Sequence, residues 1–449
     1  MRKRESVRIG TGAGFSGDRI EPAVALAERG NIDFLVFECL AERTIALAQL
    51  EKLKEPGKGF DPRLIERMEA LLATCRKNGI RIVTNSGAAN PLAGARAVAD
   101  IARRLGLSGM KVAAVTGDDV LEHVRAHAPA YRREYPALAT VENRIISANA
   151  YLGAEPIVQA LDSGADVVVT GRIADPALFL APLVHSFRWP LDDWPLIGKG
   201  ILIGHLMECA GQLTGGYFAD PPRCTVPDMA NLGFPIAAVT ATGSATFSKA
   251  PGTGGLLDVA TCTEQLLYEV HDPRQYITPD VVADFSAVRF SQVAPDVVSA
   301  VGATGALRPD RLKVVVAYLD GYMGEGQLSY VGPNALARAR LALEIVSHRL
   351  RSTAMNAADL RCEIIGVDSI VRTTGGAAPA APQEIRIRVA GRSHTQRDAA
   401  RIGDEVESLY TNGPAGGGGA VKAVREVIGL LPMLIPRDVP DPQITVEET

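Results

Sequence analysis

The chain has 449 residues, of which 47% are hydrophobic and 22% are charged, and its formal net charge is −4. A chain of this length is too long to fold around one hydrophobic core, so we expect two or three globular domains. The slight negative charge gives no basic surface for nucleic acid, and no apolar run reaches the roughly 18 residues that a membrane helix needs. We therefore expect a globular protein that binds neither nucleic acid nor a membrane.

The six cysteines are dispersed and contain no C-x-x-C pair; they are Cys39, Cys75, Cys209, Cys224, Cys262 and Cys362. Dispersed thiols are typical of a reducing compartment, and a structural zinc site is not expected without paired ligands. The basic N-terminus leads into a short strand and not into the apolar segment of a signal peptide. The sequence therefore predicts a cytoplasmic protein without a structural zinc site; it assigns no metal ligand and identifies no cofactor.

The first half of the chain alternates predicted strands and helices. The strands are expected at Val7–Thr11, Asp33–Phe37, Ile80–Thr84, Lys111–Thr116 and Ala165–Thr170. The helices are expected at Glu21–Arg29, Ala41–Lys54, Pro62–Lys77, Pro91–Leu105, Val120–Ala126 and Pro156–Ser163. Strands that are apolar on both faces, separated by helices, predict a doubly wound, Rossmann-like parallel sheet with its ligand site at the carboxyl ends of the strands.

A glycine-rich stretch, Gly10–Arg19, follows the first strand. It contains Gly12-x-Gly14-x-x-Gly17, the spacing of a dinucleotide-binding fingerprint, and Glu38 stands where the ribose-binding carboxylate is expected. In that fingerprint, however, the helix opens among the glycines, whereas Pro22 suits the first turn of a helix that begins later. Three interpretations stay open: a loop that binds an anion or substrate, a dinucleotide site, or a structural turn.

Under the first interpretation, the amides of Gly12, Gly14 and Gly17 would face the ligand. Asp18 and Arg19 follow at once and add one charge of each sign. We treat these five residues as candidate substrate-binding residues.

Polar residues follow each of the other predicted parallel strands; they are Glu38, Asn85, Asp118, Arg172 and Asp175. Because parallel strands end at one edge of a sheet, these side chains should line a common crevice. The alternative is that several of them only cap the following helices, as Asp118 and Asp175 could do. We expect a ligand site here, with Glu38 as the candidate catalytic base.

Two further segments carry candidate residues. A predicted helix, Ile201–Leu213, places His205 and Glu208 three residues apart on one face, either as an acid/base pair or as a polar stripe. A predicted strand, Pro235–Thr240, leads through the glycine-containing loop 248–255 to a helix, Leu256–Val270. Lys249 in that loop could bind a phosphate or carboxylate.

The last third of the chain predicts the order β-α-β-β-α-β, which is typical of an α+β ferredoxin-like fold. Its elements are expected at Lys313–Leu319, Pro333–Arg351, Leu360–Val371, Glu384–Ala390, Thr395–Tyr410 and Val424–Pro436, with a flexible connection at Thr373–Pro382. We therefore expect a parallel-sheet domain with the crevice at 1–230, a connecting α/β segment at 231–310 that belongs to it, and a ferredoxin-like domain at 311–449.

Motifs along nearly the whole chain resemble the AtuA family, named for acyclic terpene utilisation. They include GTGAGFSGDRIEPA, LVFECLAERTIALAQ, TNSGAANP, GRIADPALFLAPL, TGGYFADP, KAPGTGG, DGYMGEGQ and TNGPAGGGG. The resemblance implies a place in the degradation of terpenes and branched acids through coenzyme A thioesters, and in some members a small ferredoxin-fold partner. It supplies no catalytic residue.

Three functions fit this sequence. The first is a catabolic enzyme that acts on an acyl-CoA or on a branched or polycarboxylic acid in a hydration, dehydration or other lyase step. Its candidate catalytic residues are Glu38, His205 and Glu208, and Arg172 and Lys249 would pair with the substrate anion. The second is an NAD(P)-dependent oxidoreductase, and the third is a scaffold that docks a partner protein. We also expect a homo-oligomer.

Overall fold

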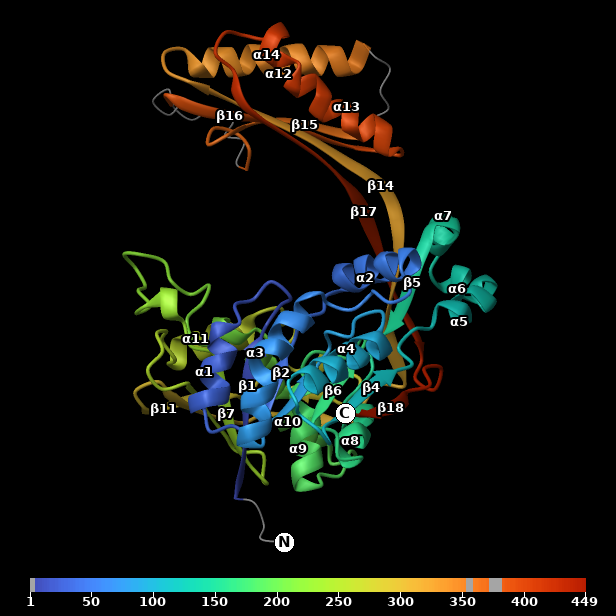
Figure 1. The fold of residues 1–449 in the computed structure, drawn as a ribbon, viewed down its shortest axis with the longest axis vertical. Coiled ribbons are helices and arrows are strands. Elements are labelled where there is room, and N and C mark those ends of the chain that lie inside the picture. The colour runs from blue at the N-terminus through green and yellow to red at the C-terminus, as the bar shows by residue number, and fades with distance from the viewer. Residues whose placement is uncertain (1–4, 353–357, 371–381) are drawn as a thin grey trace. The chain divides into compact units, whose positions relative to one another are not determined.

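The computed structural model describes residues 5–352, 358–370 and 382–449. The chain forms two compact units, one of Met1–Ala317 with Leu430–Thr449 and one of Tyr318–Gly429. The fold is mixed α/β, with one large mixed sheet and smaller antiparallel arrangements (Figure 1). No helix in the described part of the chain is long and apolar enough to cross a membrane.

The large sheet of the first unit has ten strands in the order β11-β12-β8-β7-β1-β2-β3-β6-β4-β18. Its parallel centre consists of β1 (Ser6–Ala13), β2 (Phe34–Phe37), β3 (Arg81–Thr84), β6 (Val167–Thr170) and β4 (Lys111–Thr116). Antiparallel strands complete both edges; they are β7 (Pro235–Thr240), β8 (Ala245–Lys249), β11 (Arg289–Ala294), β12 (Val297–Val301) and β18 (Gln443–Glu448). The five parallel strands predicted from the sequence are confirmed, but the sheet as a whole is mixed.

Helices cover both faces of this sheet. One face packs against α1 (Glu21–Arg29), α3 (Arg63–Asn78) and α4 (Pro91–Arg104). The other face packs against α8 (Glu155–Asp162), α9 (Ala177–Phe187) and α10 (Trp194–Glu208). Alternate residues of β2 serve the two cores, since Phe34 and Val36 lie in one and Leu35 and Phe37 in the other. This explains why the central strands are continuously apolar.

The remaining elements of the first unit are shorter or lie off the main sheet. They are α2 (Glu42–Lys54), α5 (Leu121–Ala126), α6 (Ala128–Glu134), α7 (Leu138–Val141), α11 (Val259–Leu267), β5 (Ile145–Ala150), β9 (Tyr276–Ile277), β10 (Val282–Asp284) and β13 (Thr304–Ala306). Strands β13, β10 and β9 form a small sheet, and β5 pairs with β14 (Arg311–Val331), whose first residues belong to this unit.

Two helices differ from their expected bounds because aspartates cap them. α10 begins at Trp194, not at Ile201, because the Asp193 side chain accepts a hydrogen bond from the Leu196 N–H at 3.2 Å. α11 begins at Val259, not at Leu256, because Asp258 accepts from two amides at 2.9 Å. The start of α11 therefore already has a carboxylate at its N-terminus, where the sequence suggested a bound anion.

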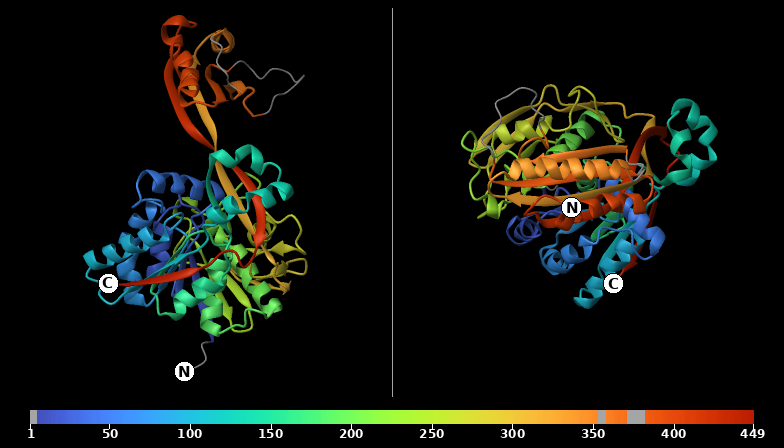
Figure 2. Two further views of the ribbon diagram at one scale, coloured as in Figure 1. Left: turned by 90° about the vertical axis from the view of Figure 1, so that its right-hand side faces the viewer. Right: turned by 90° about the horizontal axis from the view of Figure 1, so that it is seen from above.

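The second unit contains one antiparallel sheet in the order β15-β16-β14-β17. Its elements are β14 (Arg311–Val331) from Tyr318 onward, α12 (Ala335–Ser352), β15 (Ala358–Ile365), β16 (Glu384–Ser393), α13 (Gln396–Glu407), α14 (Leu409–Asn412) and β17 (Gly418–Pro436) as far as Gly429. Figure 1 and Figure 2 show α12 and α13 on one face of the sheet, where Leu328, Ile387 and Val389 form the core with them. Residues 373–381 of the expected flexible connection lie outside the described part of the chain.

Candidate functional site

Glu38 and Asn85 form one hydrogen-bonded unit beyond the ends of β2 and β3. Oε1 of Glu38 accepts hydrogen bonds from the Leu40 N–H and from Nδ2 of Asn85, both at 2.9 Å. Oδ1 of Asn85 accepts from the Cys39 N–H at 2.7 Å, so both ends of this amide are used. Glu38 is therefore anchored through one oxygen, and Oε2 is the oxygen that can face a ligand.

Arg172 lies beyond β6 and is the buried cation of this region, with 1% of its surface exposed. Its guanidinium donates to the carbonyl oxygens of Ile173 and Leu40 and to the carboxylate of Asp175. The carbon Cζ lies 4.5 Å from the centre of the Tyr151 ring, which is a cation–π distance. Arg172 thus holds the 38–40 segment and Asp175 together, and a substrate anion would have to compete with Asp175 for it.

Asp118 holds the same region in place through side-chain hydrogen bonds. Its Oδ2 accepts hydrogen bonds from the Arg172 backbone N–H at 3.0 Å and from Asn149 Nδ2 at 2.9 Å. Asp119, and not Asp118, accepts from the amide of Leu121 at the start of α5. Burial raises the pKa of Asp118 to about 6, against the opposing effect of these hydrogen bonds. Asp118 is therefore a positioning residue for the backbone at Arg172.

We expect Asp118→Asn to stabilise the protein at neutral pH. A carboxyl group whose pKa is raised in the folded state contributes stability below its unfolded pKa, and this contribution is lost as pH rises through the folded pKa. The rise in the pKa of Asp118 from 3.8 to about 6 corresponds to about 3 kcal/mol of the free energy of unfolding. Because the asparagine oxygen can accept both hydrogen bonds, wild type should lose stability relative to the variant between pH 4 and pH 7 in urea unfolding. A pH-independent difference would contradict this prediction.

His205 and Glu208 form the expected pair on α10, with Nδ1 of His205 3.0 Å from Oε1 of Glu208. Nε2 of the same ring lies 3.2 Å from the Leu266 carbonyl oxygen, which can only accept, so Nε2 carries a proton. Burial lowers the pKa of His205 to about 4 and raises that of Glu208 well above its usual range. Both pKa shifts are consistent with a neutral His205 imidazole hydrogen-bonded to a protonated Glu208 carboxyl group, in which Glu208 donates to Nδ1.

We call four residues of this region the acidic cluster: Glu38, Asp175, Glu208 and Arg172. Asp175 bonds to the arginine, and the charge of the arginine also acts on Glu38 and Glu208. Burial is the largest cause of the raised pKa of Glu38, and the charge of Asp175 raises it further, whereas Arg172 opposes both. The pKa of Glu208 rises for the same first two reasons. Because one guanidinium cannot balance the buried Glu38 and Glu208 together with the half-buried Asp175, the cluster retains at least one proton near neutral pH.

The glycine run packs tightly against its surroundings. A Cβ added to Gly12 would lie 2.4 Å from the Phe37 ring, and one added to Gly14 would lie 2.5 Å from the Cys209 backbone. The Gly14 N–H donates to Oδ2 of Asp18 at 2.9 Å, so one of the expected ligand-facing amides is already used. The run therefore reaches the end of α10 beside Glu208, with α1 beginning only at Glu21.

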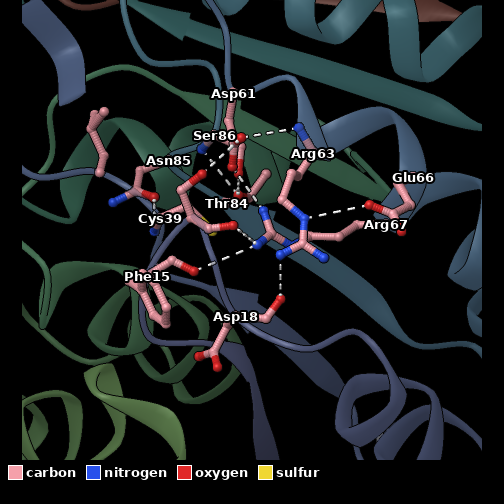
Figure 3. A network of polar contacts seen from close by, with 12 residues as sticks. Phe15, Asp18, Cys39, Asp61, Arg63, Glu66, Arg67, Thr84, Asn85 and Ser86 are labelled. Atoms are coloured by element: carbon pink, nitrogen blue, oxygen red, sulfur yellow. Dashed lines mark hydrogen bonds and ion pairs between the residues drawn. The ribbon is translucent and has the colours of Figure 1, made fainter. Parts of the chain in front are cut away.

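A buried ion pair that the sequence did not predict holds this run in place (Figure 3). Arg67 of α3 donates to Asp61 at 2.8 Å and to the Ser16 carbonyl at 2.6 Å, and Ser16 Oγ donates to Asp61 at 3.0 Å. The Asp61 N–H in turn donates to the Ser86 carbonyl at 2.8 Å. One signal was present, because Arg67 occupies a position on the apolar face of its helix between Leu64 and Leu71.

Other predicted residues lie elsewhere in the first unit. Arg19 is exposed and donates to the Ala230 carbonyl at 3.0 Å. Lys249 forms an ion pair with Asp296 at 3.1 Å and donates to the Thr253 carbonyl at 2.8 Å. Gly17 lies against the ring of Phe15 in the turn of the glycine run. These three residues do not join the acidic cluster.

A second set of residues near the cluster was missed by the sequence reasoning. Tyr151 OH donates to Glu42 at 2.6 Å, and Lys313 Nζ lies 3.0 Å from the same oxygen. Burial disfavours the Glu42 carboxylate, but these two hydrogen bonds outweigh it and lower the pKa of Glu42 to about 2. The rings of Tyr276 and Phe285 pack around His205, and their centroids lie 5.0 and 5.7 Å from the centroid of the His205 ring.

The structure defines a mixed α/β protein with a buried acidic cluster at the carboxyl ends of its parallel strands. The sequence model of the acyclic terpene utilisation family protein AtuA matches residues 7–446, and the chain belongs to this family. That membership supports a role in acyclic terpene utilisation. Comparisons with curated proteins and with solved structures gave no match.

Proposed function

We propose that this chain is an enzyme of acyclic terpene catabolism that adds water to, or removes it from, a branched or polycarboxylic acid or its coenzyme A thioester. One observation carries the proposal: beyond the ends of parallel strands, a single buried arginine bonds to Asp175 and to the Leu40 carbonyl near Glu38, and its charge also acts on Glu208 at the end of α10. Proton-retaining carboxyl groups in a buried site are suited to general acid and base catalysis near neutral pH.

In hydration, a base takes a proton from water while the water oxygen bonds to the β-carbon of an α,β-unsaturated acyl group. The electron pair of the double bond moves to the carbonyl oxygen, and an acid then delivers a proton to the α-carbon. We assign the base to Glu38 through Oε2, since Oε1 is anchored by Asn85 and Leu40. We assign the acid to Glu208, which retains a proton on Oε1 beside Nδ1 of the neutral His205.

The other candidate residues receive supporting roles in this proposal. Arg172 balances the charge of the cluster, Asp175 orients Arg172, and Asn85 and Asp118 position Glu38 and the backbone at Arg172. His205 holds the proton of Glu208 in place. Lys249 and Arg19 take no part, because their contacts lie with Asp296 and Ala230.

We further propose a ferredoxin-like fold for the second unit, supported by its β-α-β-β-α-β element order and by the sheet order β15-β16-β14-β17. A small ferredoxin-fold partner protein, a homo-oligomeric state and a cytoplasmic location stay predictions. Helix α1 begins only at Glu21, after the glycines, which counts against the dinucleotide site that the oxidoreductase alternative needs. No contact among the described residues specifically favours the scaffold alternative.

Isothermal titration calorimetry with the full chain tests the proposal. We expect binding of saturated and α,β-unsaturated acyl-CoA thioesters or of the free acids, and turnover of the unsaturated compounds to hydroxyacyl products detected by mass spectrometry. NAD and NADP serve as the comparison ligands. Binding of a nicotinamide without binding of any acid or thioester would overturn the proposal in favour of the oxidoreductase.

A further inference from the structure

An apolar cleft of about 510 Å³ opens beside the acidic cluster, within the first unit. Its apolar lining comes from α2, from the loop before α3, from α3 itself and from the loops after β2 and β3; the residues are Leu40, Leu47, Ala48, Phe60, Ile65 and Ala88. Beneath the cleft, Leu40 and Ala88 form a small apolar cluster with Ile45, which is distinct from the main cores. The volume lies in the range of small-molecule sites.

The walls of this cleft are tied together by polar contacts. Nδ2 of Asn90 donates to the carbonyl oxygens of Pro56 and Lys58 at 2.9 and 2.7 Å, which fixes the loop before α3. Lys52 Nζ of α2 donates to the Ala89 carbonyl at 2.7 Å. Because these bonds join α2, the loop and the segment after β3, the cleft is a preformed feature of the fold.

Leu40 connects the cleft with the acidic cluster. Its N–H donates to Glu38 and its carbonyl accepts from Arg172, so its main chain belongs to the cluster. Leu40 is also one of the residues that line the cleft, and it packs in the small apolar cluster with Ile45 and Ala88. Leu40 thus lies between buried acid and base groups and a mostly apolar space, whose lining also includes Thr44, Glu51 and Lys58. An amphipathic acid requires such a neighbourhood of polar and apolar surfaces.

We propose that the cleft binds the hydrocarbon chain of the substrate, so that the ligand class is an acid with a medium-length, unbranched or methyl-branched aliphatic tail. The position of the carboxyl end at the acidic cluster rests on the proposed function. The binding of the chain rests on the cleft alone. Affinity should then rise with chain length, by roughly fourfold for each buried methylene group.

Calorimetry with free fatty acids from hexanoate to decanoate, and with the matching primary alcohols, tests this inference on the full-length protein. The affinity of wild type should rise with each added methylene group, for the acids and for the alcohols alike. Ala48→Phe, which fills the cleft, should abolish the gain, and Leu47→Ser should reduce it. Leu53→Phe is the matched control, because Leu53 lies on the same helix, is 65% exposed and does not line the cleft.

The outcomes separate this inference from the proposed function. Equal affinity for short and long chains in wild type, or an unchanged chain-length dependence in both cleft variants, would overturn the cleft assignment even if the enzyme turns over a thioester. Chain-length-dependent binding of the alcohols without any turnover of acids would support the cleft and count against the lyase activity. Should Ala48→Phe fail to fold, Leu47→Ser carries the test.

Discussion

Replacing Arg172 by methionine is expected to lower the free energy of unfolding by about 3 to 5 kcal/mol, as is typical when one partner of a buried charge network is removed. The guanidinium holds the carbonyl oxygens of Leu40 and Ile173 and balances Asp175. Methionine fills a similar volume but satisfies none of these groups. Urea unfolding followed by circular dichroism measures the change.

Arg19→Met is the matched control. Arg19 is exposed and its contacts are with backbone carbonyls on the surface, so its loss should change stability by less than about 0.5 kcal/mol. Loss of Arg172 leaves carboxyl groups without their counter-charge. The difference in free energy of unfolding between wild type and Arg172→Met should therefore become smaller at low pH, where those groups are protonated. Equal stability of the two variants would show that Arg172 does not hold the cluster together.

Replacing Glu38 by glutamine is expected to reduce turnover by at least about 100-fold, the usual contribution of a general base. The amide oxygen of glutamine can still accept from Asn85 and the Leu40 N–H, so the local structure should persist. Burial raises the pKa of Glu38, so the wild-type carboxyl group contributes less to stability as pH rises. The variant should therefore be as stable as wild type at pH 8, or more stable.

Steady-state kinetics with the thioester identified by calorimetry measures this effect. Glu28→Gln on α1 provides the control, since Glu28 is exposed and lies outside the acidic cluster. Substrate affinity should change little in Glu38→Gln, so the loss should appear in kcat. If Glu38→Gln retained full turnover while Glu208→Gln lost it, the base would have to be reassigned.

The sequence predicted that Glu38, Asn85 and Arg172 emerge at one edge of the sheet because this depends on parallel strands, whereas Glu208 comes from the end of α10 and was not predicted to join them. Strands β2, β3 and β6 are neighbours in the sheet, so Glu38, Asn85 and Arg172 emerge at the same edge. The apolar runs that identify these strands are local patterns, and local patterns are visible in a single sequence. The chemical roles of these residues stay predictions.

Contacts between distant segments could not be predicted in the same way. Arg67 bonds to the Ser16 carbonyl 51 residues away, and β18 pairs Gln443 with Thr116. No local periodicity encodes such partners. The contacts of Arg19 and Lys249 could not be predicted for a related reason. The path of a loop beyond a strand end decides where a long side chain lies, and here Arg19 donates to the Ala230 carbonyl and Lys249 pairs with Asp296.

The central claim is that substrate binds where the parallel strands end. A crystal structure of Glu38→Gln with an α,β-unsaturated acyl-CoA tests it most directly, because the slow variant should preserve the ligand. We predict the acyl carbonyl group within hydrogen-bond distance of the acidic cluster and the chain directed past Leu40 into the apolar cleft. A thioester bound instead in the hollow beside α1, which is lined by Arg19, Arg29 and Asn231, would contradict the account.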